Sequence, residues 1–247
     1  IEKGVIMIDR AIERLKKTKS LLVITGAGIS AESGIPTFRG QDGLWQNYRA
    51  EELATPWAFE RDPITVWKWY DWRRGIIGKA VPNKGHIAIK RLEEMFKDFF
   101  LITQNVDGLH AKTGIKNMVE IHGNLWRVRC TRDRKVSMLT EHPLKEIPPR
   151  CECGGILRPD VVWFGESIPG EYLERSYQAI NMCDTLIVAG TSGVVYPVAS
   201  FPQMVKDNGG FVIEVNVEET PISHIADITL YGTSGEMLPL LLKGLEA

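Results

Sequence analysis

The chain has 247 residues, of which 44% are hydrophobic and 25% are charged, and its formal net charge at pH 7 is -1. This composition is typical of an ordinary globular protein, long enough for one large domain that carries a smaller lobe. A nearly neutral chain offers no broad electrostatic surface for nucleic acid or an anionic membrane, so we expect neither as a direct partner.

The segment IEKGVIMIDRAIERLKKTK at the start of the chain predicts an amphipathic helix, because Ile8, Ile12 and Leu15 share one face. It carries acidic residues and has no long apolar centre, which argues against a secretory signal. No apolar run in the sequence approaches the length of a membrane span. The four cysteines do not have the pattern of a disulfide framework. We therefore expect a cytoplasmic protein.

Four short apolar runs predict buried strands: LLVIT at 21–25, FFLIT at 99–103, TLIVA at 185–189 and FVIEV at 211–215. Apolar runs separated by helix-like stretches are typical of a parallel sheet covered on both faces. Each run ends in small or polar residues, and ligands of open parallel sheets bind just beyond the carboxyl ends of the strands. The sequence therefore predicts an α/β fold with a Rossmann-like, doubly wound sheet and one crevice along its strand ends.

Two segments interrupt this alternation. Residues 36–82 are rich in Trp and Arg and look partly helical, and residues 130–159 hold three cysteines and several prolines. We assign them to a smaller lobe made of a helical segment and a cysteine-containing insert that resembles a zinc ribbon. The predicted division gives 1–35, 83–124 and 160–247 to the Rossmann-like domain, and 36–82 and 125–159 to the smaller lobe.

The loop Gly26-Ala27-Gly28-Ile29-Ser30-Ala31 fits the pattern G-x-G-x-x-G/A directly after the first predicted strand. Glycines there let the backbone approach a pyrophosphate, and a following helix N-terminus offers amides to it. The alternative is a turn that needs only a positive φ. The preceding strand favours dinucleotide binding.

A hydride-transfer dehydrogenase would place an acidic residue at the end of a second strand, about 20 residues further on. Glu51 and Glu52 lie in that neighbourhood but follow no buried strand, whereas Asn216 and Glu218 are better placed for a ribose. The loop therefore predicts a dinucleotide bound differently from that of the usual hydride enzymes.

A second polar cluster spans ITQNVDGLH at 102–110 and EIHGN at 120–124, and it includes His122. A histidine near a ribose can take a proton from a hydroxyl, because its unperturbed pKa is about 6.5. A structural hydrogen bond is the better interpretation of the other histidines, which are His86, His110, His142 and His224.

The blocks GAGISAESGIPTFRG, TQNVDGLH, IHGN, LRPDVVWFGE, GTSGVVYP and EVN occur in this order, with the cysteine insert after IHGN. Over nearly the whole chain this arrangement resembles the sirtuins, the NAD-dependent protein lysine deacylases, and most of all their archaeal and bacterial members. The resemblance implies that the acyl oxygen of an acyl-lysine attacks the ribose of NAD as nicotinamide leaves. His122 would act as general base on the ribose hydroxyls, and water would yield free lysine and O-acyl-ADP-ribose. Such chemistry needs its groups held in fixed geometry.

The resemblance also implies the contacts with NAD. Asp107 would hold the nicotinamide amide, Asn216 the adenosine ribose, and Ser234 would lie near adenine. The full set of expected NAD contacts is Gly26, Ala27, Gly28, Ser30, Ala31, Phe38, Arg39, Trp45, Gln104, Asn105, Val106, Asp107, Gly190, Thr191, Ser192, Asn216, Val217, Glu218 and Ser234.

The segment Val162, Trp163, Phe164 and Gly165 resembles the substrate strand of the family. An extended peptide could add to it by backbone pairing, and the apolar side chains would form a tunnel for the lysine stem. Without the resemblance, VVWFGE would be interpreted as an ordinary core strand.

Tyr70 and Arg73 are three residues apart, so on a helix they share a face. An arginine fork beside a phenol suits a carboxylate. The pair resembles the Tyr-x-x-Arg signature of sirtuins that remove succinyl, malonyl or glutaryl groups, and we expect removal of both acetyl and acidic acyl groups. The alternative is a solvated Arg73 and a Tyr70 that only packs in the core.

Sirtuins usually carry two C-x-x-C pairs for a structural zinc. Here the first reads Cys130-Thr131-Arg132-Asp133, and the second is shortened to Cys151-Glu152-Cys153. Three thiolates and the Asp133 carboxylate would make a tetrahedral site, although C-x-C is not the usual spacing. Bound zinc and a metal-free insert remain equally open. Cys183 is expected to pack in the core.

Two other functions share the predicted crevice: mono-ADP-ribosyl transfer to protein, and a non-catalytic sensor of NAD or ADP-ribose. The presence of Asn105, Asp107 and His122 disfavours the sensor. The expected partners are acyl-lysine proteins, with chromatin and metabolic proteins both open as substrates.

Overall fold

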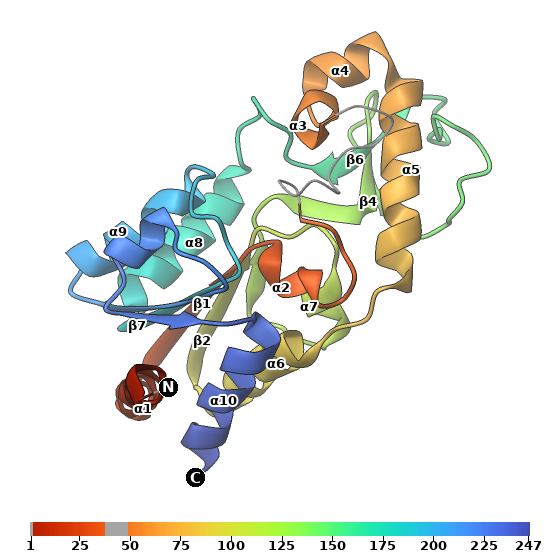
Figure 1. Ribbon diagram of the computed structural model, residues 1–247. Helices are drawn as coiled ribbons and strands as arrows, with labels where there is room; N and C mark the ends of the chain where they lie inside the picture. Colours follow the sequence, from red (N-terminus) through yellow and green to blue (C-terminus); the bar gives the residue numbers. More distant parts are fainter. Residues whose placement is uncertain (1, 38–48) are drawn as a thin grey trace.

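The computed structural model describes residues 2–37 and 49–247, and only the backbone of residues 2–5. Within these ranges the chain forms a large α/β lobe and a smaller lobe beside it (Figure 1). The six-stranded sheet of the large lobe has the order β3-β2-β1-β7-β8-β9, and every neighbouring pair is parallel. The predicted Rossmann-like fold class is confirmed.

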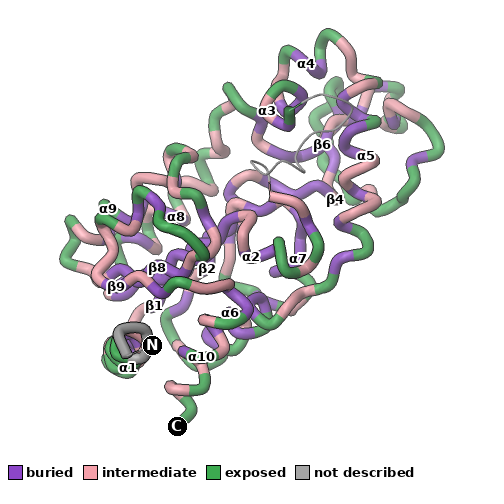
Figure 2. Tube along the Cα trace, in the orientation of Figure 1, coloured by how far each residue is buried: buried purple, intermediate pink, exposed green. Residues whose placement is uncertain are grey.

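Four strands of this sheet match the predicted apolar runs: β1 (Ser20–Thr25), β2 (Asp98–Thr103), β7 (Thr185–Ala189) and β8 (Phe211–Asn216). The sequence analysis missed the two edge strands, β3 (Met118–Glu120) and β9 (Ile228–Tyr231). Both are short, and an edge strand needs less apolar surface than a central one. The central strands are almost entirely buried (Figure 2).

Alternate side chains of these strands enter two separate cores, because successive residues of a strand point to opposite faces. One face packs against α1 (Glu2–Lys16), α6 (Lys84–Met95) and α10 (Ser234–Glu246). The other packs against α8 (Gly170–Met182) and α9 (Phe201–Asp207). Helices therefore cover both faces. In α1, Ile8, Ile12 and Leu15 pack against the first core, which confirms the predicted amphipathic helix.

In its described part, the smaller lobe combines three helices with a three-stranded antiparallel sheet of order β5-β4-β6. The helices are α3 (Ala50–Leu53), α4 (Pro56–Arg61) and α5 (Pro63–Lys79), and the strands are β4 (Gly123–Cys130), β5 (Val136–Met138) and β6 (Leu157–Val161). Helix α5 begins after Asp62, whose side chain accepts a hydrogen bond from the Thr65 amide. The residue limits of the two predicted domains stay a prediction.

The interpretation of VVWFGE as a core strand is wrong beyond its first residue, because β6 ends at Val161 and the residues Val162 to Glu166 leave the sheet. Gly165 has a φ of +86°, a left-handed conformation that favours glycine. The backbone turns there, and the Glu166 amide donates to the carbonyl oxygen of Trp163. VVWFGE is therefore a strand end followed by a turn.

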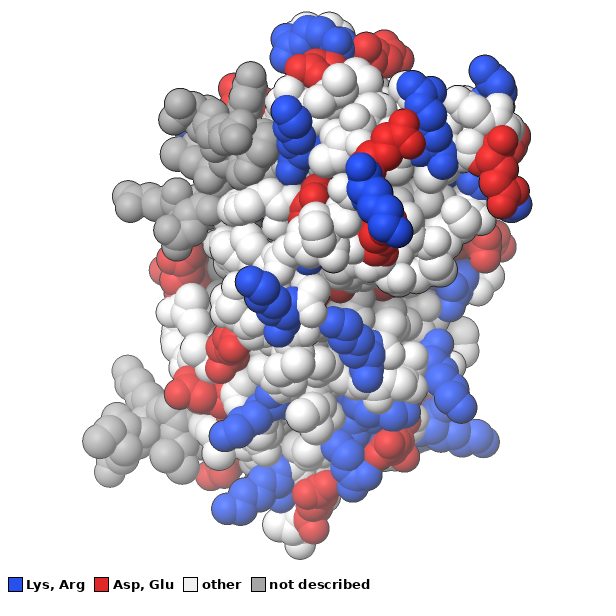
Figure 3. Space-filling view, turned by 90° about the vertical axis from the view of Figure 1, so that its right-hand side faces the viewer, with Lys and Arg blue, Asp and Glu red and all other residues white. Residues whose placement is uncertain are grey.

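Positive and negative side chains are interspersed over the face drawn in Figure 3, in keeping with the net charge of -1. Among the helices of the described residues, none combines the length and the apolar character needed to cross a membrane.

Candidate functional site

A cavity of about 810 Å³ lies where the large and small lobes meet. Its walls come from the carboxyl ends of β1, β2, β7 and β8, from α5, and from the turn that follows β6. The volume lies within the range of about 300–1,000 Å³ that is typical of ligand clefts. The cavity is therefore where the sequence placed a crevice.

Most of the residues expected to contact ligands line this one cavity. They are Gly26, Ala27, Gly28, Ser30, Tyr70, Arg73, Gln104, Asn105, Val106, Asp107, His122, Val162, Trp163, Phe164, Gly165, Gly190, Thr191, Ser192, Asn216, Val217 and Glu218. Ala31 and Ser234 are not among its lining residues: Ala31 is exposed at the end of α2 (Gly28–Ala31), and Ser234 is buried at the start of α10. Phe38, Arg39 and Trp45 lie outside the described residues.

The glycine loop is held by a close approach to the loop after β7. The Gly28 amide donates to the carbonyl oxygen of Gly190 at 2.7 Å, and the Gly26 amide donates to that of Ala189 at 3.1 Å. A Cβ at Gly28 would lie 2.8 Å from the Gly190 Cα, closer than real Cβ atoms come to a backbone. The glycines are thus required by packing between two loops as well as by room for a ligand.

Polar side chains at the strand ends are hydrogen-bonded to one another. The Asn105 amide group donates to the Gly26 carbonyl and to the Ser30 hydroxyl, and Ser30 donates to Asp107 at 2.7 Å. Burial raises the pKa of Asp107, an effect opposed by hydrogen bonds from the Leu109 amide and Ser30 and by the charge of Arg73. This part of the cavity wall is fixed before any ligand arrives.

His122 lies between β3 and β4, and its Nδ1 is 3.2 Å from the carbonyl oxygen of Gln104. A carbonyl oxygen only accepts, so this contact assigns the proton to Nδ1 and leaves a lone pair on Nε2. Burial lowers the pKa of His122 from 6.5, and the bond to Gln104 opposes that effect. The ring is therefore a neutral imidazole at neutral pH, in the form that a general base requires.

His86 and His110 lie behind the cavity wall and are buried. His86 Nδ1 accepts from the Asn83 amide, and His110 Nε2 lies 3.0 Å from the Thr25 hydroxyl. Burial lowers the pKa of His86 to about 4, so its ring is neutral at neutral pH. Both contacts agree with the structural interpretation of these two histidines.

Tyr70 and Arg73 belong to α5 and line the cavity. Tyr70 packs among Trp67 and Trp69, and its hydroxyl oxygen accepts a hydrogen bond of 2.8 Å from Trp163 Nε1. Burial raises the Tyr70 pKa to about 12, so the phenol keeps its proton. Burial lowers the pKa of the half-buried Arg73, and Coulombic interactions with Tyr70 and Asp107 oppose that effect.

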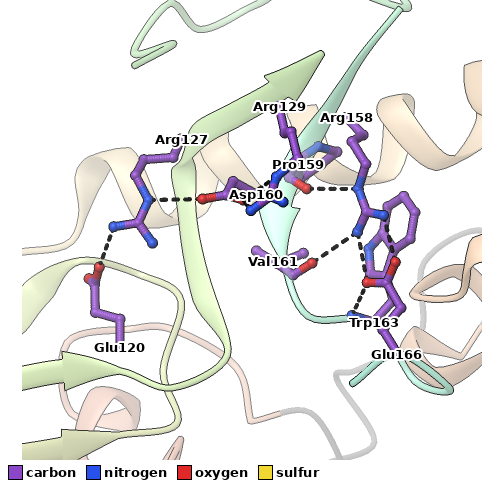
Figure 4. A network of polar contacts seen from close by, with 9 residues as sticks. All are labelled: Glu120, Arg127, Arg129, Arg158, Pro159, Asp160, Val161, Trp163 and Glu166. Atoms are coloured by element: carbon purple, nitrogen blue, oxygen red, sulfur yellow. Dashed lines mark hydrogen bonds and ion pairs between the residues drawn. The ribbon is translucent and has the colours of Figure 1, made fainter. Parts of the chain in front are cut away.

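The turn after β6 is held by a compact polar network (Figure 4). Arg158 makes two hydrogen bonds to the Glu166 carboxylate, at 2.6 and 2.8 Å, and a third to the Val161 carbonyl. Glu166 also accepts from the Trp163 amide at 2.9 Å. Two further amides of this turn donate hydrogen bonds to neighbouring segments. The Val162 amide donates to the His122 carbonyl, and the Phe164 amide donates to the Ala54 carbonyl.

A model of the Sir2 family matches residues 26–197 of the chain. The chain belongs to the Sir2 family. A relative from Aquifex aeolicus, named NAD-dependent protein deacylase, is 58% identical over 210 residues, which are 85% of this chain and 88% of the relative. The predicted resemblance to sirtuins is confirmed.

Solved Sir2 structures share the whole architecture. A Sir2 homologue mutant in complex with 2'-O-acetyl ADP ribose has a TM-score of 0.92 and 47% identity, and the match covers 96% of each chain. A Sir2 homolog in complex with NAD has the same TM-score and identity, with 96% of this chain and 93% of that chain covered.

The cysteine insert of this Sir2 chain brings four metal-ligating residues together. The ligand atoms of Cys130, Asp133, Cys151 and Cys153 all lie within 4.8 Å of one another. Ligands at about 2.3 Å from a tetrahedral zinc are roughly 3.8 Å apart, and the sulfurs of Cys130 and Cys153 are 3.4 Å apart. The donor set is therefore compatible with a structural zinc.

The sequence analysis missed a further part of the Sir2 cavity wall. These residues are Ile35, Pro36, Thr37, Glu51, Ala54, Val161, Glu166, Ser167, Ile168, Leu173, Val195, Tyr196 and Pro197. Most are apolar and carry no chemical signal of their own. Eight of them lie inside the motif blocks, so the resemblance could have pointed to them: Ile35, Pro36, Thr37, Val161, Glu166, Val195, Tyr196 and Pro197.

Proposed function

We propose that this chain is an NAD-dependent protein-lysine deacylase that releases nicotinamide and O-acyl-ADP-ribose. The observation that carries the proposal is His122, a neutral imidazole in the wall of the cavity whose Nδ1 is engaged by Gln104. The deacylase name of the Aquifex aeolicus relative supports the reaction type. Protein acyl-lysines are then the substrates, and the four free cysteines fit a reducing, cytoplasmic setting.

NAD, when bound, supplies a nicotinamide leaving group on its ribose. The loops after β1, β7 and β8 would hold its phosphates and adenosine ribose, since their glycines and Asn216 line the cavity. Asp107 would accept hydrogen bonds from the nicotinamide amide, and Asn105 would orient a ribose hydroxyl or a water. His122 Nε2 would take the proton of a ribose hydroxyl, which makes that oxygen a nucleophile.

The reaction type is tested by mixing an acetyl-lysine peptide with NAD and weighing the products by mass spectrometry. We expect nicotinamide, free-lysine peptide and O-acetyl-ADP-ribose in equal amounts. His122→Ala should lower the rate by about 100-fold or more, since it removes the base. His224→Ala is the matched control, because this histidine is exposed at the surface.

Two results would contradict this proposal. ADP-ribose attached to protein would indicate ADP-ribosyl transfer, and NAD bound without nicotinamide release would indicate a sensor.

We further propose that the cavity accepts acidic acyl groups as well as acetyl. Tyr70 and Arg73 line the same wall, three residues apart on α5, and a phenol with a partly desolvated guanidinium suits a carboxylate. We expect Arg73→Met to lower the ratio of succinyl to acetyl kcat/KM by roughly 10- to 100-fold, because a charge-assisted bond is lost.

Lys68→Met is the matched control for Arg73→Met, since Lys68 is an exposed cation on the same helix. The ratio should stay at the wild-type value in this control. An unaltered ratio in Arg73→Met would exclude the acidic-acyl proposal while leaving the deacylase reaction intact.

A further inference from the structure

We infer that Trp163 is a specificity-determining residue. Its indole positions the Tyr70 hydroxyl so that the proton of this hydroxyl points to an acidic acyl group. This inference rests on the proposed acceptance of acidic acyl groups. It assigns the Trp163 side chain a function in addition to the backbone pairing expected between this segment and a substrate peptide. That function acts through the hydrogen bond from Trp163 to Tyr70.

The first step concerns the direction of the Tyr70–Trp163 bond. An indole nitrogen only donates, so Trp163 Nε1 donates and the phenol oxygen accepts, at 2.8 Å. A phenol has one proton, and this bond does not use it. Within the described residues the Tyr70 hydroxyl donates no hydrogen bond, and Tyr70 lines the cavity. The hydroxyl is thus left to donate to a ligand.

The second step concerns what holds Trp163 still. The guanidinium carbon of Arg158 lies 3.6 Å from the centroid of the Trp163 ring, and the Phe59 ring lies 5.1 Å from it. Arg158 is itself fixed by two bonds to Glu166, whose carboxylate also accepts from the Trp163 amide. Figure 4 shows Arg158, Trp163 and Glu166 lying next to one another. The indole therefore has both its plane and its backbone fixed.

The third step concerns where the phenol sits relative to charge. Tyr70 and Arg73 share one face of α5, and the electrostatic influence of Arg73 on the Tyr70 hydroxyl favours its ionised form. Burial outweighs that influence and keeps the phenol protonated, so it acts as a donor. A carboxylate bound by Arg73 would then receive the Tyr70 proton as a second, directed hydrogen bond.

The experiment is a double-mutant cycle on Trp163→Phe and Tyr70→Phe, read as the ratio of succinyl to acetyl kcat/KM. Trp163→Phe keeps an aromatic ring and removes the N–H. We expect it to lower the ratio by about fivefold, chiefly through a higher KM for the succinyl peptide, and Tyr70→Phe to lower it by roughly tenfold. In the Tyr70→Phe background, Trp163→Phe should change the ratio no further. Because both peptides are measured on one preparation, the ratio cancels any loss of folded enzyme.

Trp67→Phe is the matched control. Trp67 is also buried, also packs against Tyr70, and also loses one indole hydrogen bond, to the Leu157 carbonyl at 2.7 Å. A structural effect of losing an indole would appear in both Trp variants, whereas an effect through the Tyr70 hydroxyl appears only in Trp163→Phe. We expect Trp67→Phe to keep the wild-type ratio.

Three results overturn the inference: a wild-type ratio in Trp163→Phe, an equal fall in Trp67→Phe, or a full further fall in the Tyr70→Phe background. If these occur while Arg73→Met still lowers the ratio, only the function of Trp163 is wrong. If Arg73→Met leaves the ratio unaltered, the acidic-acyl proposal fails and this inference fails with it.

Discussion

His122 shows how a single side chain can be prepared for its chemistry by its surroundings. The Gln104 carbonyl engages one ring nitrogen, which assigns the lone pair to the other. Burial disfavours the charged ring and lowers its pKa, while the hydrogen bond to Gln104 raises it by less. The same residue at an exposed position would be partly protonated near pH 6.5 and would be a base for only part of the molecules.

The pH dependence of kcat/KM follows from this shift. A group whose pKa is lowered stays neutral to lower pH, so the active form is lost only as pH falls below 6.5, through the lowered pKa of His122. We expect the acid limb of kcat/KM for an acetyl peptide to have its midpoint below 6.5. The measurement is a set of initial rates from acid to alkaline pH.

Two observations would contradict that assignment of the acid limb. One is a midpoint above 6.5, and the other is an identical limb in the residual activity of His122→Ala.

At the scale of elements, loops fix the site more than helices do. Gly190 has a φ of +62°, and a Cβ there would come within 2.5 Å of the Ile29 amide nitrogen. The loops after β1 and β7 therefore pack directly against each other, and both line the cavity. Helix α2, by contrast, is only four residues long and contributes little beyond its position.

The cysteine insert is a second element whose order depends on local contacts. We expect purified protein to contain about one zinc per chain, held by Cys130, Asp133, Cys151 and Cys153. Asp133→Ala should lose most of that zinc and lower Tm by about 5 °C or more, since each kcal/mol shifts a domain of this size by about 2–4 °C. Elemental analysis and thermal unfolding measure the two effects.

Glu152→Ala is the control for the zinc site, because this carboxylate is in the same loop but its side chain is almost fully exposed. It should retain both the zinc and the wild-type Tm. Wild-type protein that contains no zinc when prepared without chelator would show that the insert is metal-free.

At the scale of the whole molecule, sequence patterns predict what is local. The four central strands and the residues that follow them could be found because each is an apolar run ending in small or polar groups. Their convergence on one cavity follows from the geometry of a parallel sheet. Motif resemblance added the expected reaction and the individual contacts with NAD.

What the sequence could not show depends on contacts between distant segments. Tyr70 and Trp163 are 93 residues apart, and nothing in either segment predicts their hydrogen bond. The end of β6 was also missed, because VVWFGE is uniformly apolar until Gly165. The expected place of Ser234 near adenine stays a prediction, since Ser234 is buried at the start of α10, where the adjacent Gly235 amide donates to the Glu32 carboxylate at 2.7 Å.

The Val162 amide donates to the His122 carbonyl at 2.8 Å, and at Gly123, with a φ of +87°, a side chain would collide with the Asp160 backbone. The segment that carries His122 and the segment beside which a peptide would bind are thus joined directly through their backbones. If the two lobes move relative to each other, we expect these two joined segments to move together as a rigid unit. Opening and closing of the lobes would then change the distance from His122 to the loops after β1, β7 and β8. The distance from the imidazole to the acylated lysine would stay constant.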